Sequence, residues 1–185
     1  MNKQPEITDM TRSILVKAFC DYYKTRPIEK ISVKEIAAKA GYSRATFYNY
    51  FTDVYDLLEY VENEFISYMV DRIQNNIGRA ADFDGFIQAF VETLYEKEEY
   101  INVFMNSSNR SSFIDQMKLK MVPLLLSVFN VSQDNTRAGY ALEFYISGLI
   151  PVLGSWLKNE QDIPADELAD LIRGILQEGI LKQIR

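Results

Sequence analysis

The sequence of 185 residues contains no histidine and a single cysteine, Cys20. Nucleophilic systems of the Ser-His-Asp or Cys-His type need a histidine, so both are excluded. One cysteine without histidine cannot build a structural zinc site or close an internal disulfide. We therefore predict no catalytic residue, no metal site and no cofactor, and we expect a reducing, cytoplasmic environment.

Long hydrophobic runs are also scarce. The longest uncharged apolar run, FYISGLIPVLGSWL, lies between Glu143 and Lys158 and has 14 residues, whereas a membrane-spanning helix needs about 20. The N-terminal segment MNKQPEITDMTR is polar and lacks the apolar core of a signal peptide. We expect the run to form a buried helix of a protein without a membrane partner.

The net charge of -6 conceals an uneven distribution. Residues 1–52 carry nine basic and five acidic side chains, a net charge of +4, and the remaining residues carry a net charge of −10. A basic segment can bind the phosphates of a nucleic acid, and an acidic remainder reduces non-specific binding to polyanions. The other interpretation is a chance excess of four charges in a short window.

Apolar residues recur at helical spacing along nearly the whole chain, and no long stretch alternates as a strand would. We predict an all-α protein of about nine helices. The first is capped by Thr8 or Asp9 and ends before Pro27. Two short helices start at Ser32 and after Ser43, and the others lie near 53–77, 84–97, 99–107, 112–129, 135–158 and 164–184. Pro123 and Pro151 fall inside predicted helices, where we expect a kink.

Two of the short helices form a helix-turn-helix. Ser32 and Glu35 make the pattern of a capping box, in which each residue satisfies a free amide of the first turn. Gly41 ends this helix, and Ser43 caps the next one after a tight turn. Helices joined in this way commonly place the second helix in the major groove of DNA.

The segment ISVKEIAAKAGYSRATFYNYFTDVYDLL, from Ile31 to Leu58, resembles the TetR family of bacterial transcriptional regulators. The matching features are the serine cap, the Ile-Ala pair, the Ala-Gly turn, the Ser-Arg-Ala-Thr start of the recognition helix and its aromatic end. The resemblance implies a helix-turn-helix DNA-binding domain over residues 1–52. It also implies a helical regulatory domain over 53–185 that binds a ligand and dimerises.

The resemblance and the position of each residue in its helix together give the candidate DNA contacts. In the recognition helix, Arg44 can donate a bidentate pair to guanine, and Asn49 can read adenine. Tyrosine hydroxyls can reach the sugar–phosphate backbone, and free amides at helix starts favour phosphate. The candidates are Ser32, Lys34, Ser43, Arg44, Ala45, Thr46, Tyr48, Asn49 and Tyr50.

Other side chains near this motif have plainer interpretations. Phe47 and Phe51 are expected in the core of the small domain, and Lys17 and Lys39 are expected to be solvated charges. Family members often carry a lysine in the first turn of the fourth helix as a phosphate contact. Val54 takes that place here, so affinity is expected to depend more on Lys34, Arg44 and Arg12.

The acidic remainder is rich in Phe, Tyr and Met, which fill either a core or an apolar ligand pocket. Glu143 stands in an otherwise apolar helix, where it faces a ligand, pairs with Arg137 or near Lys158, or lies exposed. The candidates for the pocket are Tyr60, Phe65, Tyr68, Phe86, Phe90, Phe104, Met117, Met121, Tyr140, Glu143 and Phe144.

The last two predicted helices carry apolar stripes that suit a two-fold four-helix bundle. Small residues recur every seven positions at Ala141, Gly148 and Ser155, which allows close helix approach. The candidates for the dimer interface are Ala141, Gly148, Leu149, Val152, Ser155, Trp156, Leu168, Leu171, Ile172, Ile175 and Leu176.

These observations favour a homodimeric repressor that binds a palindromic DNA operator and is released by a small apolar or aromatic effector. Two alternatives stay open. One is a protein-interaction module or coactivator of the same fold without its own DNA binding, which the missing lysine favours. The other is a helical enzyme, for which no paired-carboxylate motif stands out.

Overall fold

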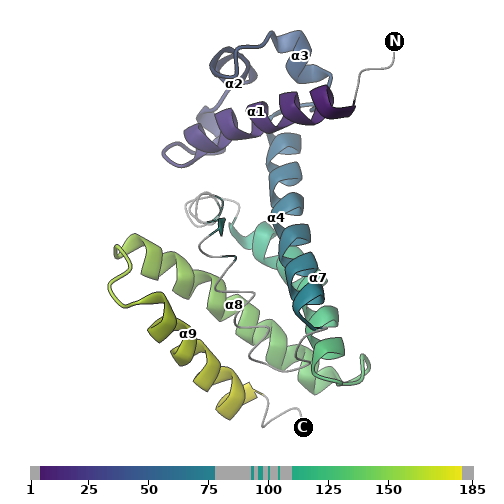
Figure 1. Ribbon diagram of the computed structural model, residues 1–185, viewed down its shortest axis with the longest axis vertical. Helices are drawn as coiled ribbons and strands as arrows, with labels where there is room; N and C mark the ends of the chain where they lie inside the picture. Colours follow the sequence, from purple (N-terminus) through teal and green to yellow (C-terminus); the bar gives the residue numbers. More distant parts are fainter. Residues whose placement is uncertain are drawn as a thin grey trace. The chain divides into compact units, whose positions relative to one another are not determined.

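This structure, a computed structural model, describes residues 5–77 and 110–180 together with residues 93, 96, 97, 100 and 104 (Figure 1). Within these residues the chain forms seven α-helices and contains no strand, as an all-α protein should. The predicted count of about nine helices is not matched there. Two of the predicted helices, near 84–97 and 99–107, fall almost wholly outside the described residues.

The chain divides into two compact units, one ending at Glu64 and the other beginning at Phe65. Helix α4, Val54–Ile77, contributes its N-terminal part to the first unit and the rest to the second. The domain boundary predicted after residue 52 coincides with the loop before this helix and stays a prediction.

In the first unit, α1 (Pro5–Tyr23) crosses the beginning of α4, α2 (Val33–Lys39) packs against α1, and α3 (Arg44–Tyr48) packs against α2 (Figure 1). A short 3-10 turn, Ile28–Lys30, joins α1 to α2. Helix α1 begins at Pro5, earlier than the predicted caps, because proline suits the first turn of a helix. Apolar side chains at helical spacing fill the core of this unit: Leu15, Phe19, Ile36, Phe47, Leu57 and Val61. Each such burial stabilises the fold by about 1.5–3 kcal/mol.

Local sequence signals set the ends of these helices. Ser32 and Glu35 form the predicted capping box, and the Ser43 hydroxyl accepts the Thr46 amide at 3.1 Å. Asp53 accepts the amides of Tyr55 and Asp56 at 2.8 and 2.9 Å, which starts α4. Gly41 adopts φ 74°, a left-handed conformation in which a side chain is strained, and so allows the tight turn before α3.

In the second unit, α7 (Arg110–Val128) packs against α8 (Thr136–Lys158). Helix α9 (Ala165–Gly174) continues as a π-helical segment, Ile175–Ile180, which also packs against α8. Both α7 and α8 continue through a proline, Pro123 and Pro151. The Trp156 indole donates to the Ile163 carbonyl at 2.8 Å and fixes the turn into α9. The buried side chains include Phe113, Met117, Met121 and Leu125 on α7, and Leu142, Ile146, Ile150 and Leu153 on α8.

Among the described helices, α8 alone is long and apolar enough to cross a membrane by length and composition. Core helices of proteins without a membrane pass the same test. Helix α8 packs against α7 and against the segment Ile175–Ile180, so its apolar side has protein partners.

Candidate nucleic-acid interface and regulatory surfaces

Helix α3 has one exposed face and one buried face. Arg44, Ala45 and Asn49 are exposed, and Tyr48 is about half-exposed. Phe47 is completely buried, with 0% of its surface exposed, as predicted for a core residue. The outward face therefore carries the residue types that read base edges and grip phosphates.

Arg44 and Tyr48, one helical turn apart, hold their polar ends together on this face. The Arg44 guanidinium donates to the Tyr48 hydroxyl at 3.4 Å and lies 6.0 Å from the centre of its ring. Ser43 and Thr46 are engaged with each other, their hydroxyl oxygens 3.0 Å apart. The first turn of α3 thus presents one cationic donor beside a cluster of hydroxyls.

At the start of α2, Lys34 is exposed, whereas Ser32 is occupied by its own helix. The Ser32 amide and hydroxyl donate to the same Glu35 carboxylate oxygen at 3.0 and 2.6 Å. Arg26 donates to the other oxygen at 2.9 Å. The Ser32 hydrogen bonds and the Arg26 guanidinium lower the pKa of Glu35 from 4.5 to about 2. The Ser32 side chain therefore acts as a helix cap, and Lys34 is the side chain here that is open to phosphate.

Substitution of Glu35 by glutamine is expected to destabilise the protein near neutral pH and to have little effect in acid. Because the folded-state pKa is depressed, the carboxylate stabilises the fold above about pH 4.5, and this contribution is lost as the pH falls toward 2. Urea midpoints from circular dichroism, measured for Glu35→Gln and for the wild-type protein from about pH 6 to about pH 3, would show the difference in stability become smaller as the pH falls. Glu29→Gln, at a nearby exposed glutamate, is the control. A stability difference between Glu35→Gln and the wild-type protein that stays constant over this range would contradict the lowered pKa of Glu35.

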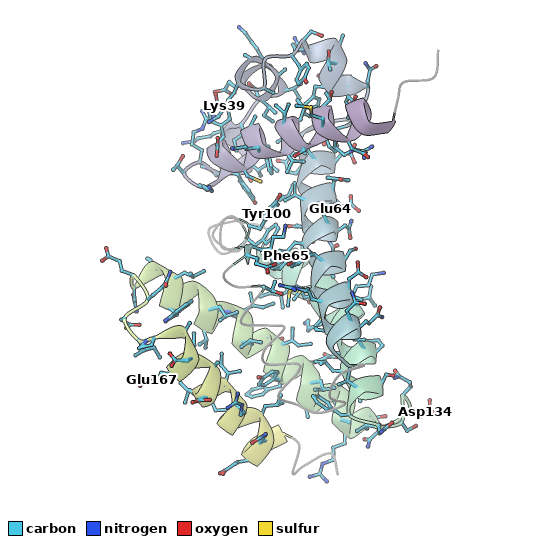
Figure 2. The ribbon with its side chains drawn as sticks, viewed as in Figure 1. Lys39, Glu64, Phe65, Tyr100, Asp134 and Glu167 are labelled. Atoms are coloured by element: carbon cyan, nitrogen blue, oxygen red, sulfur yellow. The ribbon has the colours of Figure 1, made fainter. Side chains whose placement is uncertain are left out.

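Lys39, at the end of α2 (Figure 2), is exposed, as predicted for a solvated charge, and is also ion-paired. Its ammonium lies 3.1 Å from the Asp21 carboxylate and 4.7 Å from the centre of the Tyr22 ring. The Arg26 guanidinium lies 4.3 Å from the same ring centre. Tyr22 therefore sits between two cations, which ties α2 to the end of α1.

The first turn of α4 carries no basic side chain. Val54 is buried, so it packs in the core rather than facing a phosphate. Asp53 and Asp56 flank it, and Asp56 accepts the Thr52 amide at 2.7 Å. Tyr55 is exposed, as is Asp53.

The candidates for a ligand pocket fall into separate places. Phe86 and Phe90 lie outside the described residues. Tyr60 is in the first unit, half-buried against Phe51 at 5.5 Å between ring centres. Tyr68 is half-buried on α4, and its hydroxyl donates to the Glu96 carboxylate.

Four further pocket candidates are buried together in the second unit. The rings of Phe65 and Phe104 lie 5.2 Å apart, and Phe104 stacks on Phe113 at 4.3 Å. Met117 and Met121 are buried on α7. This aromatic cluster is packed side chain against side chain.

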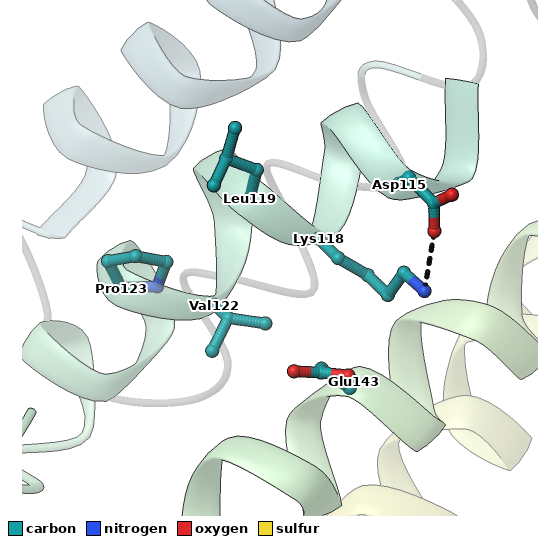
Figure 3. Close-up of a pocket in the computed structure, with 6 residues that line it drawn as sticks. All are labelled: Asp115, Lys118, Leu119, Val122, Pro123 and Glu143. Carbon is teal, nitrogen blue, oxygen red and sulfur yellow. Dashed lines mark ion pairs between the residues drawn. The ribbon is translucent and has the colours of Figure 1, made fainter. Parts of the chain in front are cut away.

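The remaining pocket candidates lie on the surface of α8. Tyr140 and Phe144 are 70% and 80% exposed, and Glu143 is exposed as well. Glu143 borders a hollow of about 360 Å³ with residues of α7: Asp115, Lys118, Leu119, Val122 and Pro123 (Figure 3). Lys118 pairs with Asp115 at 2.8 Å, and Asp115 first and Glu143 further raise the pKa of Lys118. Glu143 is therefore exposed, and its charge acts on Lys118 at the hollow.

The candidates for a dimer interface divide by exposure in the single chain. Trp156, Leu168, Ile172 and Leu176 are buried within the single chain. Ala141 and Leu149 are half-buried. Those exposed are Gly148, Val152, Ser155, Leu171 and Ile175.

The burial of Glu62 and the ring contacts of Arg12 were not identified from the sequence. Glu62 on α4 is buried, and desolvation first, with Glu59 second, raises its pKa to about 7. Its spacing from Leu58 and Phe65 placed it on the buried stripe, which was a usable signal. Arg12 lies against Tyr50 and Tyr60, which are distant in sequence, so no local pattern indicates the contact.

Two family models match the chain. Residues 20–61 match the model of bacterial regulatory proteins of the tetR family, and residues 81–178 match a transcriptional regulator C-terminal region. The transcriptional activator of the dhaKLM operon, DhaS of Lactococcus lactis, is 38% identical over 63 residues. That alignment covers 34% of this chain and 34% of DhaS, about a third of each protein.

Solved structures resemble the whole chain. The fatty acid degradation regulator FadR from Bacillus halodurans has a TM-score of 0.74 at 18% identity, with 97% of this chain and 98% of that chain covered. NalD of Pseudomonas aeruginosa, the secondary repressor of the MexAB-OprM multidrug efflux pump, has a TM-score of 0.65 at 18% identity, with 95% and 98% covered. At these identities the likeness shows the fold alone.

Proposed function

Because the chain belongs to the TetR family of bacterial transcriptional regulators and is a DNA-binding regulator, we propose that it acts as a homodimeric, ligand-responsive repressor in the cytoplasm. Each protomer places α3 in a major groove, and the two-fold axis of the dimer selects a roughly palindromic operator. Regulation requires no catalysis, and a chain without histidine offers few groups for it.

The observation that carries the DNA contacts is the exposed Arg44–Tyr48 pair on α3. Arg44 is the base-reading or phosphate-gripping cation, and Tyr48 holds it and adds a hydroxyl toward the backbone. Thr46, Asn49 and Lys34 complete the surface. Ser32 contributes to it by capping α2.

Combining Arg44→Ala with Tyr48→Phe is expected to weaken operator binding about 10- to 100-fold, since a good arginine–base contact is worth about 1–3 kcal/mol. Fluorescence anisotropy with a duplex selected by the wild-type protein from a random library would measure the loss. Lys17→Ala removes an exposed cation of α1 and is the control. Unaltered binding by the double variant would contradict these contacts.

For the dimer, we propose the exposed face of α8 and its continuation onto α9. Tyr140, Phe144, Gly148 and Val152 follow one another at four-residue spacing, so they lie along one side of α8. Leu171 and Ile175 add exposed apolar side chains on α9 and the segment that follows. Tyr140 and Phe144 are therefore assigned to the dimer face rather than to a pocket. Exposed apolar side chains gathered in this way mark an interaction surface.

For the effector, we propose a small, mostly apolar molecule that binds in the second unit beside the Tyr145 hydroxyl of α8. The Tyr145 hydroxyl is buried and has no hydrogen-bond partner among the described residues, and its burial raises its pKa. A ligand with a hydrogen-bond acceptor would satisfy this donor. The effector shifts the DNA-binding equilibrium only as far as its affinities for the two states differ.

A second candidate function is that of an interaction partner or coactivator of the same fold that does not bind DNA itself. The lack of a basic side chain in the first turn of α4 favours it. The salt dependence of DNA binding separates the two functions, because each phosphate contact adds about one unit to the slope of log affinity against log salt. A flat dependence would favour the second function.

A further inference from the structure

Two consecutive residues of α1 contact the two ends of the recognition helix. The buried Thr11 hydroxyl donates to the Tyr42 hydroxyl at 3.5 Å, and Tyr42 immediately precedes the cap of α3. The Arg12 guanidinium lies 5.8 Å from the centre of the Tyr50 ring, and Tyr50 follows Asn49, the C-cap of α3. Helix α1 therefore holds α3 before its start and after its end.

Arg12 also joins the end of α3 to α4. Its guanidinium lies 5.4 Å from the centre of the Tyr60 ring, within the range of a cation–π interaction. The Tyr60 ring meets Phe51 edge to face at 5.5 Å, and Phe51 meets the buried Phe47 at 5.6 Å. Burial first and Glu64 second raise the pKa of the Tyr60 hydroxyl, and Arg12 opposes them, which agrees with a guanidinium close to that oxygen.

Helix α3 needs such contacts because it has only five residues. A helix of this length is not stable alone, so its orientation is set by the side chains that pack against it. Small errors in the orientation of a recognition helix displace every side chain that reads a base. Non-specific attraction to phosphate, in contrast, tolerates such errors.

We propose that Arg12 is a positioning residue for sequence recognition: it holds α3 against α4 through Tyr50 and Tyr60, and it does not contact the DNA itself. Its guanidinium is already engaged by the two rings and by Asp9, whose carboxylate lies at 3.3 Å. This inference rests on the DNA-binding function of the chain. It replaces the sequence-based expectation that Arg12 supplies affinity as a phosphate contact.

The test compares Arg12→Gln with Arg12→Lys and with Lys17→Gln, which removes one exposed charge from the same helix. Affinity is measured for two duplexes of equal length, one enriched by the wild-type protein from a random library and one with its bases scrambled. Arg12→Gln is expected to lower the affinity for the enriched duplex roughly five- to tenfold, because two cation–π contacts are lost. The affinity for the scrambled duplex should fall no more with Arg12→Gln than with Lys17→Gln. The slope of log affinity against log salt should be the same for these two variants. Arg12→Lys should recover part of the specific affinity.

Equal losses on both duplexes, with a salt slope about one unit lower than that of Lys17→Gln, would overturn the proposal and make Arg12 a phosphate contact. The proposal would also be overturned if Arg12→Gln and Lys17→Gln had equal affinities for each of the two duplexes. Should Arg12→Gln fail to fold by circular dichroism, Arg12→Lys and Tyr60→Leu decide the question by the same ratio of specific to non-specific affinity. A wild-type protein that enriches no duplex would contradict DNA binding itself and this inference with it.

Discussion

Replacement of Phe47 by alanine is expected to lower the free energy of unfolding of the first unit by about 3–5 kcal/mol. Phe47 is completely buried, and its ring meets Phe51 at 5.6 Å and Tyr48 edge to face at 5.7 Å. Its removal costs the transfer of the ring from water, the cavity left behind and these ring contacts. A domain is stable by only about 5–15 kcal/mol, so a large part of the stability would be lost.

Urea denaturation followed by far-UV circular dichroism would measure the change. Phe47→Leu keeps most of the volume and should lose far less. Tyr48→Ala, at the adjacent half-exposed position, should change stability by no more than about 1 kcal/mol. A loss below about 1 kcal/mol for Phe47→Ala would show that the ring is not part of the core.

Introducing aspartate at both Leu171 and Ile175 is expected to dissociate the proposed dimer. The two side chains are 53% and 57% exposed in the single chain, and a two-fold interface would bury four of them. Burying the exposed half of each contributes roughly 1 kcal/mol, so four contribute about 4 kcal/mol and about a 1000-fold change in the dissociation constant. Four carboxylates facing one another weaken the dimer further.

Sedimentation velocity at micromolar protein would show monomer in place of dimer. Operator affinity should fall at least about 100-fold, because only the dimer engages both half-sites at once. Leu119→Asp is the matched control, since Leu119 is 72% exposed on α7 beside the hollow in Figure 3. A double variant that stays dimeric while Leu119→Asp dissociates would move the interface to α7.

The ends of the short helices could be predicted from sequence because their causes are local. Ser32, Ser43 and Asp53 cap their helices with atoms only two or three residues away. The same locality explains why Phe47 was correctly expected in the core: its position on α3 follows from helical spacing alone.

The function of the apolar residues in the second unit could not be predicted in the same way. Helical spacing shows that a face is apolar, but not whether the same chain, a ligand or a second copy covers it. Trp156 and Leu168 were expected at an interface and are covered within the chain, whereas Phe144 was expected at a ligand and is exposed. The contacts of Arg12 with Tyr50 and Tyr60 link distant positions, which no local pattern records.

The two faces of α3 also bear on how operator preference can evolve. Phe47 and the contacts of α1 through Thr11 and Arg12 fix the helix. Ala45 and Asn49, in contrast, are exposed and take no part in the core. Substitutions at exposed positions usually change stability by less than about 0.5 kcal/mol. In the proposed complex with DNA, changes at these two positions would therefore alter operator preference without compensating mutations elsewhere. A library randomised at both positions should stay largely folded and contain variants with altered base preference.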